Sequence, residues 1–271
     1  MAILLRRNGL PCIIPFINLT NQYKTTCQIF SPQEIESLRK GGKILHDCLR
    51  YLEPLVQPGI TTAELDKLAE AFIRDHGGVS AFKGYHDYPA TLCTSVNDVC
   101  VHGIPNNEEL KEGDIVAVDC GVTFEGLITD SCITVPVGTI SDSTAHLLEA
   151  TKKALQVGID QVHAGAHTND ISKAIHASLV EDGYDAMRPL TGHGLGDDLH
   201  QFPEIFNFPQ KHDGPELPLN TIIAIEPIST AGSVNIREDP DNWTLRTSDG
   251  ALSGHYEHTV LVTGEGCEVL T

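Results

Sequence analysis

The chain has 271 residues, of which 37 are acidic and 18 are basic, so its formal net charge at pH 7 is −19. This charge argues against nucleic acid as a substrate and against binding to an anionic membrane surface, because both require a cationic face. No apolar run reaches the ~18 residues that a transmembrane helix needs, so no membrane contact is expected.

Residues 1–30 differ in composition from the rest of the chain, since they contain three basic residues, two prolines and no acidic residue. We expect a poorly ordered N-terminal extension or an organellar leader here, followed by a catalytic domain over residues 31–271. A secretory signal is disfavoured because no small-residue cleavage site follows the apolar stretch. The eight cysteines form no CxxC pair, which favours reduced thiols and a cytoplasmic location.

Two helices are predicted at the start of the domain. Ser31 and Glu34 form a capping box around a proline at the first helical position. A second helix is expected to start at Thr61 or Thr62, where Glu64 would close a second capping box, and to end at the Gly77-Gly78 pair. Strand-like runs follow over residues 90–101, 115–122 and 127–137.

This order of elements repeats in the second half of the chain. Helices are predicted over about residues 143–162 and 168–183, with strand-like runs over 221–228, 233–236 and 256–262. Residues 56–77 align without a gap on residues 162–183, at an offset of 106 with six identities. We therefore predict an α+β fold of two pseudo-symmetric halves, each with two helices and strands, and a functional site at their seam.

Two aspartates on neighbouring strand-like runs indicate a metal site. If the connecting turn is centred between Phe124 and Glu125, Asp119 and Asp130 lie directly opposite each other, with Cβ atoms ~5 Å apart. Two carboxylates at this short distance in an apolar setting repel each other, so they need a shared proton or a cation between them.

The second half supplies matching residues. Glu226 ends an apolar strand 107 residues after Asp119, Glu257 precedes another apolar run, and His193 lies between glycines that permit close approach to a ligand. Four carboxylates and one histidine favour a pair of divalent cations such as Mn, Fe, Co or Zn. Such a pair promotes hydrolysis of amides or esters, whereas covalent catalysis is disfavoured because no GxSxG elbow is present.

Several sequence strings, taken in this order, resemble the type I methionine aminopeptidase family over residues 31–271. The strings are GYHDYP at 84–89, SVND at 95–98, VHGIP at 101–105, VD at 118–119, TD at 129–130, GHGLG at 192–196, IEP at 225–227 and YEHT at 256–259. The resemblance implies a pita-bread fold with a central, mainly antiparallel sheet. It also implies removal of the initiator methionine from nascent proteins and peptides, with preference for a small second residue.

The resemblance implies a ligand set for two divalent metal ions, either Co, Mn, Fe or Zn. Asp119 would chelate one metal, Asp130 and Glu257 would bridge both, and His193 and Glu226 would bind the other. A metal-bridged water would attack the scissile carbonyl, with Glu226 relaying its proton.

The resemblance also implies residues that contact the substrate. His102 would contact the substrate main chain, and His200 would stabilise the developing oxyanion. Phe82 and Leu199 depart from the residues usual in the family, so the shape of the pocket is expected to differ. The methionine side chain would lie among Tyr85, Tyr88, Cys93 and Trp243.

Two alternatives stay open. An Xaa-Pro aminopeptidase or prolidase would use the same ligands but usually carries a whole domain before the catalytic one. A non-catalytic pita-bread binding protein would be signalled by loss of a ligand, and all five ligands are present. We expect a monomer, because the acidic chain shows no sign of an apolar interface, and a transient ribosome contact would need a local basic patch.

Overall fold

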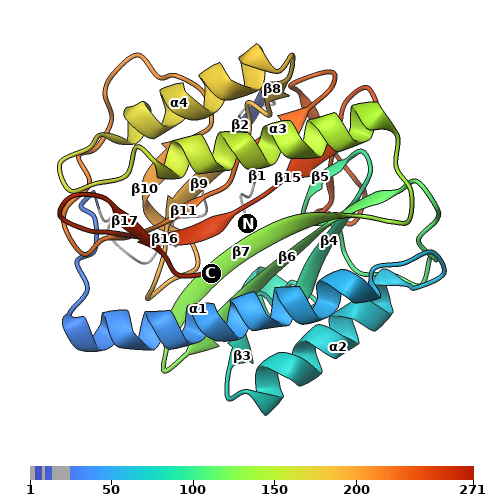
Figure 1. Cartoon of the computed structure of the whole chain (residues 1–271), viewed down its shortest axis with the longest axis horizontal. Coiled ribbons are helices and arrows are strands. Elements are labelled where there is room, and N and C mark those ends of the chain that lie inside the picture. The colour runs from blue at the N-terminus through green and yellow to red at the C-terminus, as the bar shows by residue number, and fades with distance from the viewer. Residues whose placement is uncertain (1–3, 8–9, 14–24) are drawn as a thin grey trace.

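Two pairs of helices flank a set of antiparallel sheets in the computed structural model, which describes residues 4–7, 10–13 and 25–271 (Figure 1). The α1–α2 pair and the α3–α4 pair lie on opposite sides of the view in Figure 1, with strands between them. The helices are α1 (Pro32–Leu52), α2 (Thr62–Asp75), α3 (Asp142–Ile159) and α4 (Thr168–Glu181), with short 3-10 helices η1 (Glu53–Leu55) and η2 (Tyr85–Asp87).

Every strand pair among the described residues is antiparallel. The first half holds β3 (Val79–Ser80), β6 (Ile115–Phe124) and β4 (Leu92–Val96) in the order β3-β6-β4, with β7 (Leu127–Pro136) also paired to β6. The second half holds the order β10-β9-β11-β16-β17, comprising β10 (Gln201–Phe206), β9 (Thr191–Gly194), β11 (Ile222–Ile225), β16 (His258–Val262) and β17 (Cys267–Val269).

Three smaller sheets complete the architecture. One has the order β15-β12-β8, from β15 (Ser253–His255), β12 (Ile228–Thr230) and β8 (Asp185–Ala186). Another has the order β13-β14-β5, from β13 (Ile236–Glu238), β14 (Leu245–Thr247) and β5 (Val99–Val101). The last is the hairpin of β1 (Leu4–Arg7) and β2 (Leu10–Ile13). The strand predicted over residues 233–236 is wrong except at its last residue, because Ser233 and Asn235 make turn-type side-chain contacts.

Both predicted capping boxes are present. The Ser31 side chain accepts from the Glu34 N–H and the Glu34 carboxylate accepts from the Ser31 N–H. Thr61 and Glu64 form the same reciprocal pair at the start of α2, so Thr61 rather than Thr62 is the N-cap. These local contacts satisfy N–H groups that the first turn of a helix leaves unpaired.

The internal repeat predicted from the sequence is confirmed by geometry. Helices α2 and α4 both have 14 residues and begin 106 positions apart. An antiparallel bridge joins Thr61 to Glu109 in the first half, and the corresponding bridge joins His167 to Glu216 in the second. The two halves therefore share the boundaries of their second helix and the contact that fixes its start.

The seam between the halves is formed by main-chain contacts from β7 to the segment that leads into β16. The amides and carbonyls of Cys132 and Glu257 pair with each other at 3.3 and 2.9 Å. The Thr259 hydroxyl accepts from the Asp130 N–H at 2.8 Å and donates to the Asp130 carbonyl at 2.7 Å. These bonds fix the strands that carry Asp130 and Glu257 against each other.

Each half has its own apolar core between its helix pair and its sheet, and a third cluster includes Phe30. Phe30 is 1% exposed and its N–H bonds to the Asn220 carbonyl, so packing begins before the Ser31 helix cap. Most of the N-terminal extension expected over residues 1–30 lies outside the described residues. Within the described part of the chain, no helix has the length and apolarity to cross a membrane.

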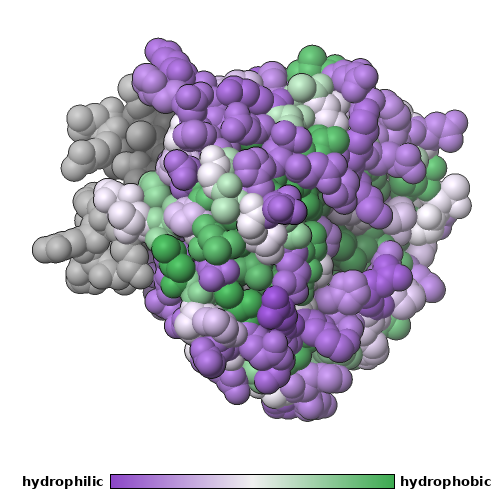
Figure 2. Space-filling view, turned by 60° about the vertical axis from the view of Figure 1, so that its left-hand side comes forward, coloured by the Kyte–Doolittle hydropathy of each residue, from purple (hydrophilic) through white to green (hydrophobic). Residues whose placement is uncertain are grey.

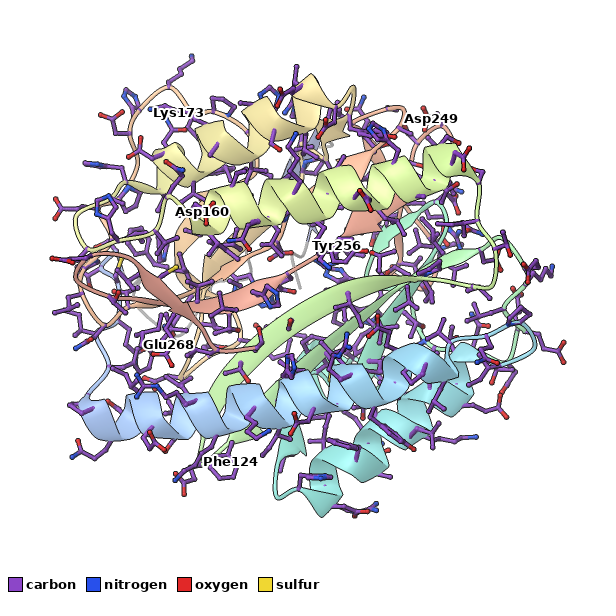
Figure 3. The ribbon with its side chains drawn as sticks, viewed as in Figure 1. Phe124, Asp160, Lys173, Asp249, Tyr256 and Glu268 are labelled. Atoms are coloured by element: carbon purple, nitrogen blue, oxygen red, sulfur yellow. The ribbon has the colours of Figure 1, made fainter. Side chains whose placement is uncertain are left out.

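Hydrophilic side chains cover most of the face in Figure 2, with hydrophobic ones in scattered patches. Figure 3 places Phe124 at the end of the β6–β7 hairpin and Glu268 on β17 near α1. The Glu268 carboxylate accepts two hydrogen bonds from Arg39 on α1, at 2.8 and 2.7 Å, which ties the C-terminal strand to the first helix.

Candidate active site

The β6–β7 hairpin turns one residue later than the sequence predicts. Phe124 pairs with Leu127, so the two-residue turn is Glu125-Gly126, with φ values of 50° and 83°. Positive φ at both positions is typical of the type I′ turn, whose twist matches that of antiparallel strands. The glycine adopts this conformation without the steric cost that a Cβ brings.

This turn changes the register of the two aspartates. Asp119 pairs with Cys132 and Asp130 pairs with Gly121, so the prediction that the aspartates lie directly opposite is wrong. They are diagonal neighbours instead. A shift of two residues keeps side chains on the same face, whereas a shift of one would have separated them. Both carboxylates are buried, at 5% and 1% exposure.

His193 lies on β9, between β10 and β11. A Cβ at Gly192 would lie 2.4 Å from the Ala224 carbonyl oxygen, and one at Gly194 would lie 2.3 Å from that of Phe202. The flanking glycines thus allow close main-chain approach of neighbouring strands, which differs from the ligand approach predicted from the sequence. This packing places the His193 ring at the seam.

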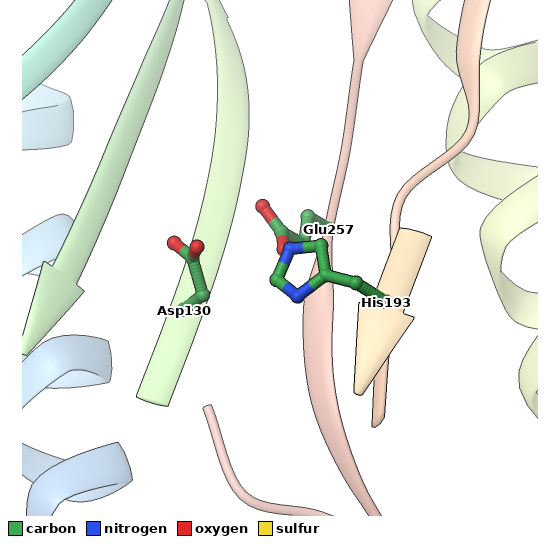
Figure 4. Close-up of side chains that lie close together, drawn as sticks. All are labelled: Asp130, His193 and Glu257. Atoms are coloured by element: carbon green, nitrogen blue, oxygen red, sulfur yellow. The ribbon is translucent and has the colours of Figure 1, made fainter. Parts of the chain in front are cut away.

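Side chains from four strands or strand ends converge at the seam. Figure 4 shows Asp130 from β7, His193 from β9 and Glu257 from the segment before β16 pointing toward one another, and one ligand atom from each lies within 4.8 Å of the others. Glu226, directly after β11, places Oε1 3.3 Å from Nε2 of His193. A second group within 4.8 Å comprises Glu226, His255 and Glu257.

The side-chain oxygen and nitrogen atoms of this cluster are suited to coordinate a cation. Buried side-chain atoms without a hydrogen-bond partner include Asp119 Oδ1, Asp130 Oδ1, His193 Nε2, Glu226 Oε1, His255 Nε2 and Glu257 Oε1. Buried polar atoms are normally paired, and so many orphaned acceptors in one place need a positive charge between them. Carboxylate oxygens with imidazole nitrogens suit divalent Mn, Fe, Co or Zn.

Burial shifts the protonation of the cluster. Burial raises the pKa of Asp130 to about 6 and that of Glu226 to about 8. It also raises the pKa of Asp119 and of Glu257 well above the ordinary range, and neighbouring carboxylates add to the shifts of these last two groups. Burial also lowers the pKa of His193 to about 3, so this ring is neutral at pH 7. Without a cation, the acids therefore resist ionisation.

His102 lies at the end of β5 with φ of 61°, a strained conformation for a residue with a side chain. The following Gly103 is required because a Cβ there would lie 2.2 Å from the Thr94 carbonyl oxygen. The rings of His102 and Trp243 lie edge to face with their centroids 6.4 Å apart. His102 is thus held at 2% exposure beside the only tryptophan.

His200 follows β9 and is 7% exposed. Its ring centroid lies 4.4 Å from that of His193, which places it next to the carboxylate cluster. The Tyr85 hydroxyl lies 3.0 Å from its Nδ1. Burial lowers the pKa of His200 well below its usual range, so the ring is neutral.

The predicted pocket residues also lie together. Tyr88 and Trp243 stack edge-to-face with centroids 4.9 Å apart, and Tyr88 bonds to the carbonyls of Leu92 and Gly103. The apolar cluster contains Phe82, Tyr88, Ala90, Cys93 and Leu199, with Ala81, Tyr85, Ile104, Ile128 and Trp243 packed against it. Both departures from the family pattern therefore contribute to the same apolar wall.

The sequence analysis missed His255. It lies on β15, is 2% exposed, and its Nε2 is 3.7 Å from Glu226 Oε2 and 3.8 Å from Glu257 Oε2. Alternation along an extended chain puts residues i and i+2 on the same face, so the proximity of His255 to Glu257 in the string HYEH was an available signal.

The model for metallopeptidase family M24 matches residues 36–264 of this chain. This chain belongs to metallopeptidase family M24. Within M24, the methionine aminopeptidase of Clostridium perfringens is 42% identical over 238 residues, which cover 88% of this chain and 96% of that protein. Methionine aminopeptidase 1 of Bacillus subtilis is 39% identical over 241 residues, covering 89% and 97%.

Solved M24 structures agree with this membership. The crystal structure of methionine aminopeptidase from Rickettsia prowazekii superposes with a TM-score of 0.89 at 34% identity, covering 91% of this chain and 100% of that chain. An Xaa-Pro dipeptidase from Bacillus anthracis superposes with a TM-score of 0.74 at 22% identity, covering 90% of this chain and 61% of that chain. This second likeness extends to the fold alone. The predicted pita-bread α+β fold is confirmed.

Proposed function

We propose that this chain is a methionyl aminopeptidase that removes the initiator methionine from nascent proteins and peptides. The observation that carries the proposal is the buried cluster of orphaned carboxylate and imidazole atoms, together with an apolar cluster of aromatic residues and Cys93. Membership of M24 and about 40% identity to bacterial methionine aminopeptidases support it.

We assign the metal ligands to the five residues that the sequence indicated, Asp119, Asp130, His193, Glu226 and Glu257. The orphaned atoms on each of them support a pair of divalent cations, drawn from Co, Mn, Fe and Zn. When bound, such cations polarise a carbonyl and lower the pKa of a water molecule.

The chain's own groups then position substrate and move protons. Glu226 is the group suited to take the proton from water, because its carboxylate reaches the centre of the proposed cation site, with Oε1 3.3 Å from Nε2 of His193. His102 lies beside the Trp243 ring, where it orients the substrate main chain. His200 offers a neutral N–H to the carbonyl oxygen that becomes negative during hydrolysis.

The pocket fits an unbranched thioether side chain. Tyr85, Tyr88, Cys93 and Trp243 line it with aromatic and sulfur surface, which interacts favourably with methionine sulfur at ~0.3–1.5 kcal/mol per contact. Phe82 and Leu199 close the apolar wall. We infer preference for N-terminal methionine followed by a small residue.

We also propose that the protein acts as a cytoplasmic monomer. Seven cysteines with described side chains are free thiols, which supports a reducing compartment. Four of the six exposed large apolar residues in the described part of the chain lie on separate elements: Tyr51 on α1, Val79 on β3, Val180 on α4 and Val269 on β17. This distribution supports a monomer.

The direct test is mass spectrometry of peptides beginning Met-Ala, Met-Leu and Ala-Pro after incubation with metal-stripped protein plus Mn(II) or Co(II). Loss of methionine from the Met-Ala peptide alone is the expected result. Cleavage of the Ala-Pro peptide would instead support a proline-directed peptidase. No cleavage with any metal would support a non-catalytic binding protein.

A further inference from the structure

We propose that His255 is an additional metal ligand, which forms a second three-residue cation-binding group with Glu226 and Glu257. This inference rests on the proposed metallopeptidase function and extends its ligand set from five residues to six. It gives each of two cations its own imidazole: His193 for one and His255 for the other.

The distances carry the assignment. His255 Nε2 lies 3.7 Å from Glu226 Oε2 and 3.8 Å from Glu257 Oε2, which is longer than an N–H···O hydrogen bond of ~2.7–3.2 Å. Two ligands that each lie ~2.0–2.2 Å from one cation are separated by roughly 3–4 Å. The spacing of the three atoms therefore fits a shared cation better than direct hydrogen bonds.

The surroundings of His255 provide a second argument. The residue is 2% exposed and its Nε2 has no hydrogen-bond partner, although it faces two buried carboxylates. Its main chain is fixed by the Thr134 hydroxyl, which accepts from the His255 N–H at 3.0 Å and donates to the His255 carbonyl at 2.6 Å. A histidine whose main chain is fixed in this way, and whose buried ring nitrogen is unpaired, is positioned for a ligand.

The arrangement of the two groups supports a pair of sites. Asp130, His193 and Glu257 form one group and Glu226, His255 and Glu257 form the other, so Glu257 is common to both. A shared carboxylate is the geometry expected of two neighbouring cations. Two imidazoles among oxygen ligands favour Zn, Co or Fe over Mg or Ca, because imidazole suits borderline metals.

The test compares His255→Gln with His146→Gln, a matched substitution on the exposed face of α3. Glutamine keeps an N–H donor at position 255 but removes the imidazole. The full-length proteins are loaded with Co(II), and NMR counts the paramagnetically shifted imidazole signals. Calorimetry measures Co(II) and Zn(II) affinity, and circular dichroism verifies folding.

We expect two sets of shifted imidazole signals in the unchanged protein and in His146→Gln, and one set in His255→Gln. The weaker of the two cation affinities should fall by more than ~100-fold in His255→Gln, beyond the ~10–100-fold effect typical of residues that only orient a ligand. Two retained sets, or an affinity within 10-fold of the unchanged protein, would overturn the assignment. Neither readout depends on peptide cleavage, so failure of the proposed activity is detected separately by the Met-Ala assay.

Discussion

The Tyr85 hydroxyl lies 3.0 Å from Nδ1 of His200 and joins η2 to the loop after β9. Burial raises the pKa of Tyr85, so the hydroxyl keeps its proton, and we infer that it donates to Nδ1 of His200 rather than accepting from it. Nδ1 of the neutral ring then accepts, and the ring proton is on Nε2. Tyr85 thus does more than line the pocket, because it fixes the tautomer that lets His200 donate to a substrate carbonyl.

Tyr85→Phe keeps the aromatic wall and removes this hydrogen bond. We expect kcat for a Met-Ala peptide to fall about 2- to 10-fold, as the loss of one hydrogen bond of ~0.5–1.5 kcal/mol implies, with KM nearly unchanged. Nitrogen-15 NMR of the His200 ring should report a mixed tautomer in the variant. An unchanged kcat together with an unchanged ring spectrum would show that Tyr85 only lines the pocket.

Local signals in the sequence predicted the fold well where neighbouring residues determine the structure. The Ser31–Glu34 and Thr61–Glu64 capping boxes define helix starts through contacts three residues apart, and the offset of 106 between α2 and α4 reflects a repeated pattern. The prediction of the hairpin register was wrong because the register depends on the Glu125-Gly126 turn, and Glu-Gly is not a strong signal for a type I′ turn.

The sequence named residues that the structure brings together, but it did not predict their geometry. Asp130, His193 and Glu257 are 63 or more positions apart in sequence, from 130 to 193 to 257, and meet only because β7 pairs across the seam with the segment before β16. The sequence did not predict strand β9, because Thr191–Gly194 has only four residues and two of them are glycine. Its glycines allow the neighbouring strands β10 and β11 to approach β9 closely, and no local sequence pattern reveals that requirement.

Asp130→Asn should abolish methionine release and weaken cation binding while leaving the fold intact. Asparagine is nearly the same size, so its effect on packing is small, but it removes the negative charge that a bridging ligand supplies. Metal content after dialysis, peptide hydrolysis and circular dichroism measure the three effects. Asp142→Asn, on the first turn of α3, is the matched control on the surface. Full activity in Asp130→Asn would contradict the two-cation assignment.

Removal of the cations should make stability depend on pH in a defined direction. Burial raises the pKa of Glu226 from 4.5 to about 8 and that of Asp130 from 3.8 to about 6. A carboxyl with a raised folded-state pKa stabilises the fold below its unfolded value and loses that contribution as pH rises through the folded pKa. We therefore expect these two carboxyls to lower the stability of the metal-free protein as pH rises from 5 to 8.5, and bound cations to reverse that loss, whereas the buried neutral histidines lower stability only below about pH 6.5.

Thermal unfolding of chelator-treated protein and of Glu226→Gln checks this pH dependence. Glutamine does not titrate, so the Tm of the unchanged protein should fall relative to the variant as pH rises, by about 2–4 °C per kcal/mol. Buried neutral histidines lower the stability of both proteins equally at acid pH, so their effect cancels in the comparison. A Tm difference that stays constant from pH 5 to pH 8.5 would contradict the raised pKa of Glu226.

The loop that carries Trp243 depends on one aspartate. The Asp241 carboxylate accepts from the Trp243 N–H at 2.9 Å, from the Thr244 N–H at 2.8 Å and from the Thr244 hydroxyl at 2.6 Å. Because Trp243 contacts both Tyr88 and His102, a loosened loop should affect the pocket before it affects the chemistry. Asp241→Ala is therefore expected to raise KM for Met-Ala peptides about 5- to 20-fold, corresponding to ~1–2 kcal/mol, with little change in kcat.

Asp249→Ala provides the matched control for Asp241→Ala, because Asp249 also accepts main-chain N–H bonds, from Ser233 and Ala251, in a turn beyond the pocket. Its KM should equal that of the unchanged protein. Intrinsic fluorescence of the single tryptophan should shift toward the solvent-exposed value in Asp241→Ala only. Equal KM in both variants would mean that Trp243 is held by its ring contacts, since the loop hydrogen bonds would then be dispensable for the pocket.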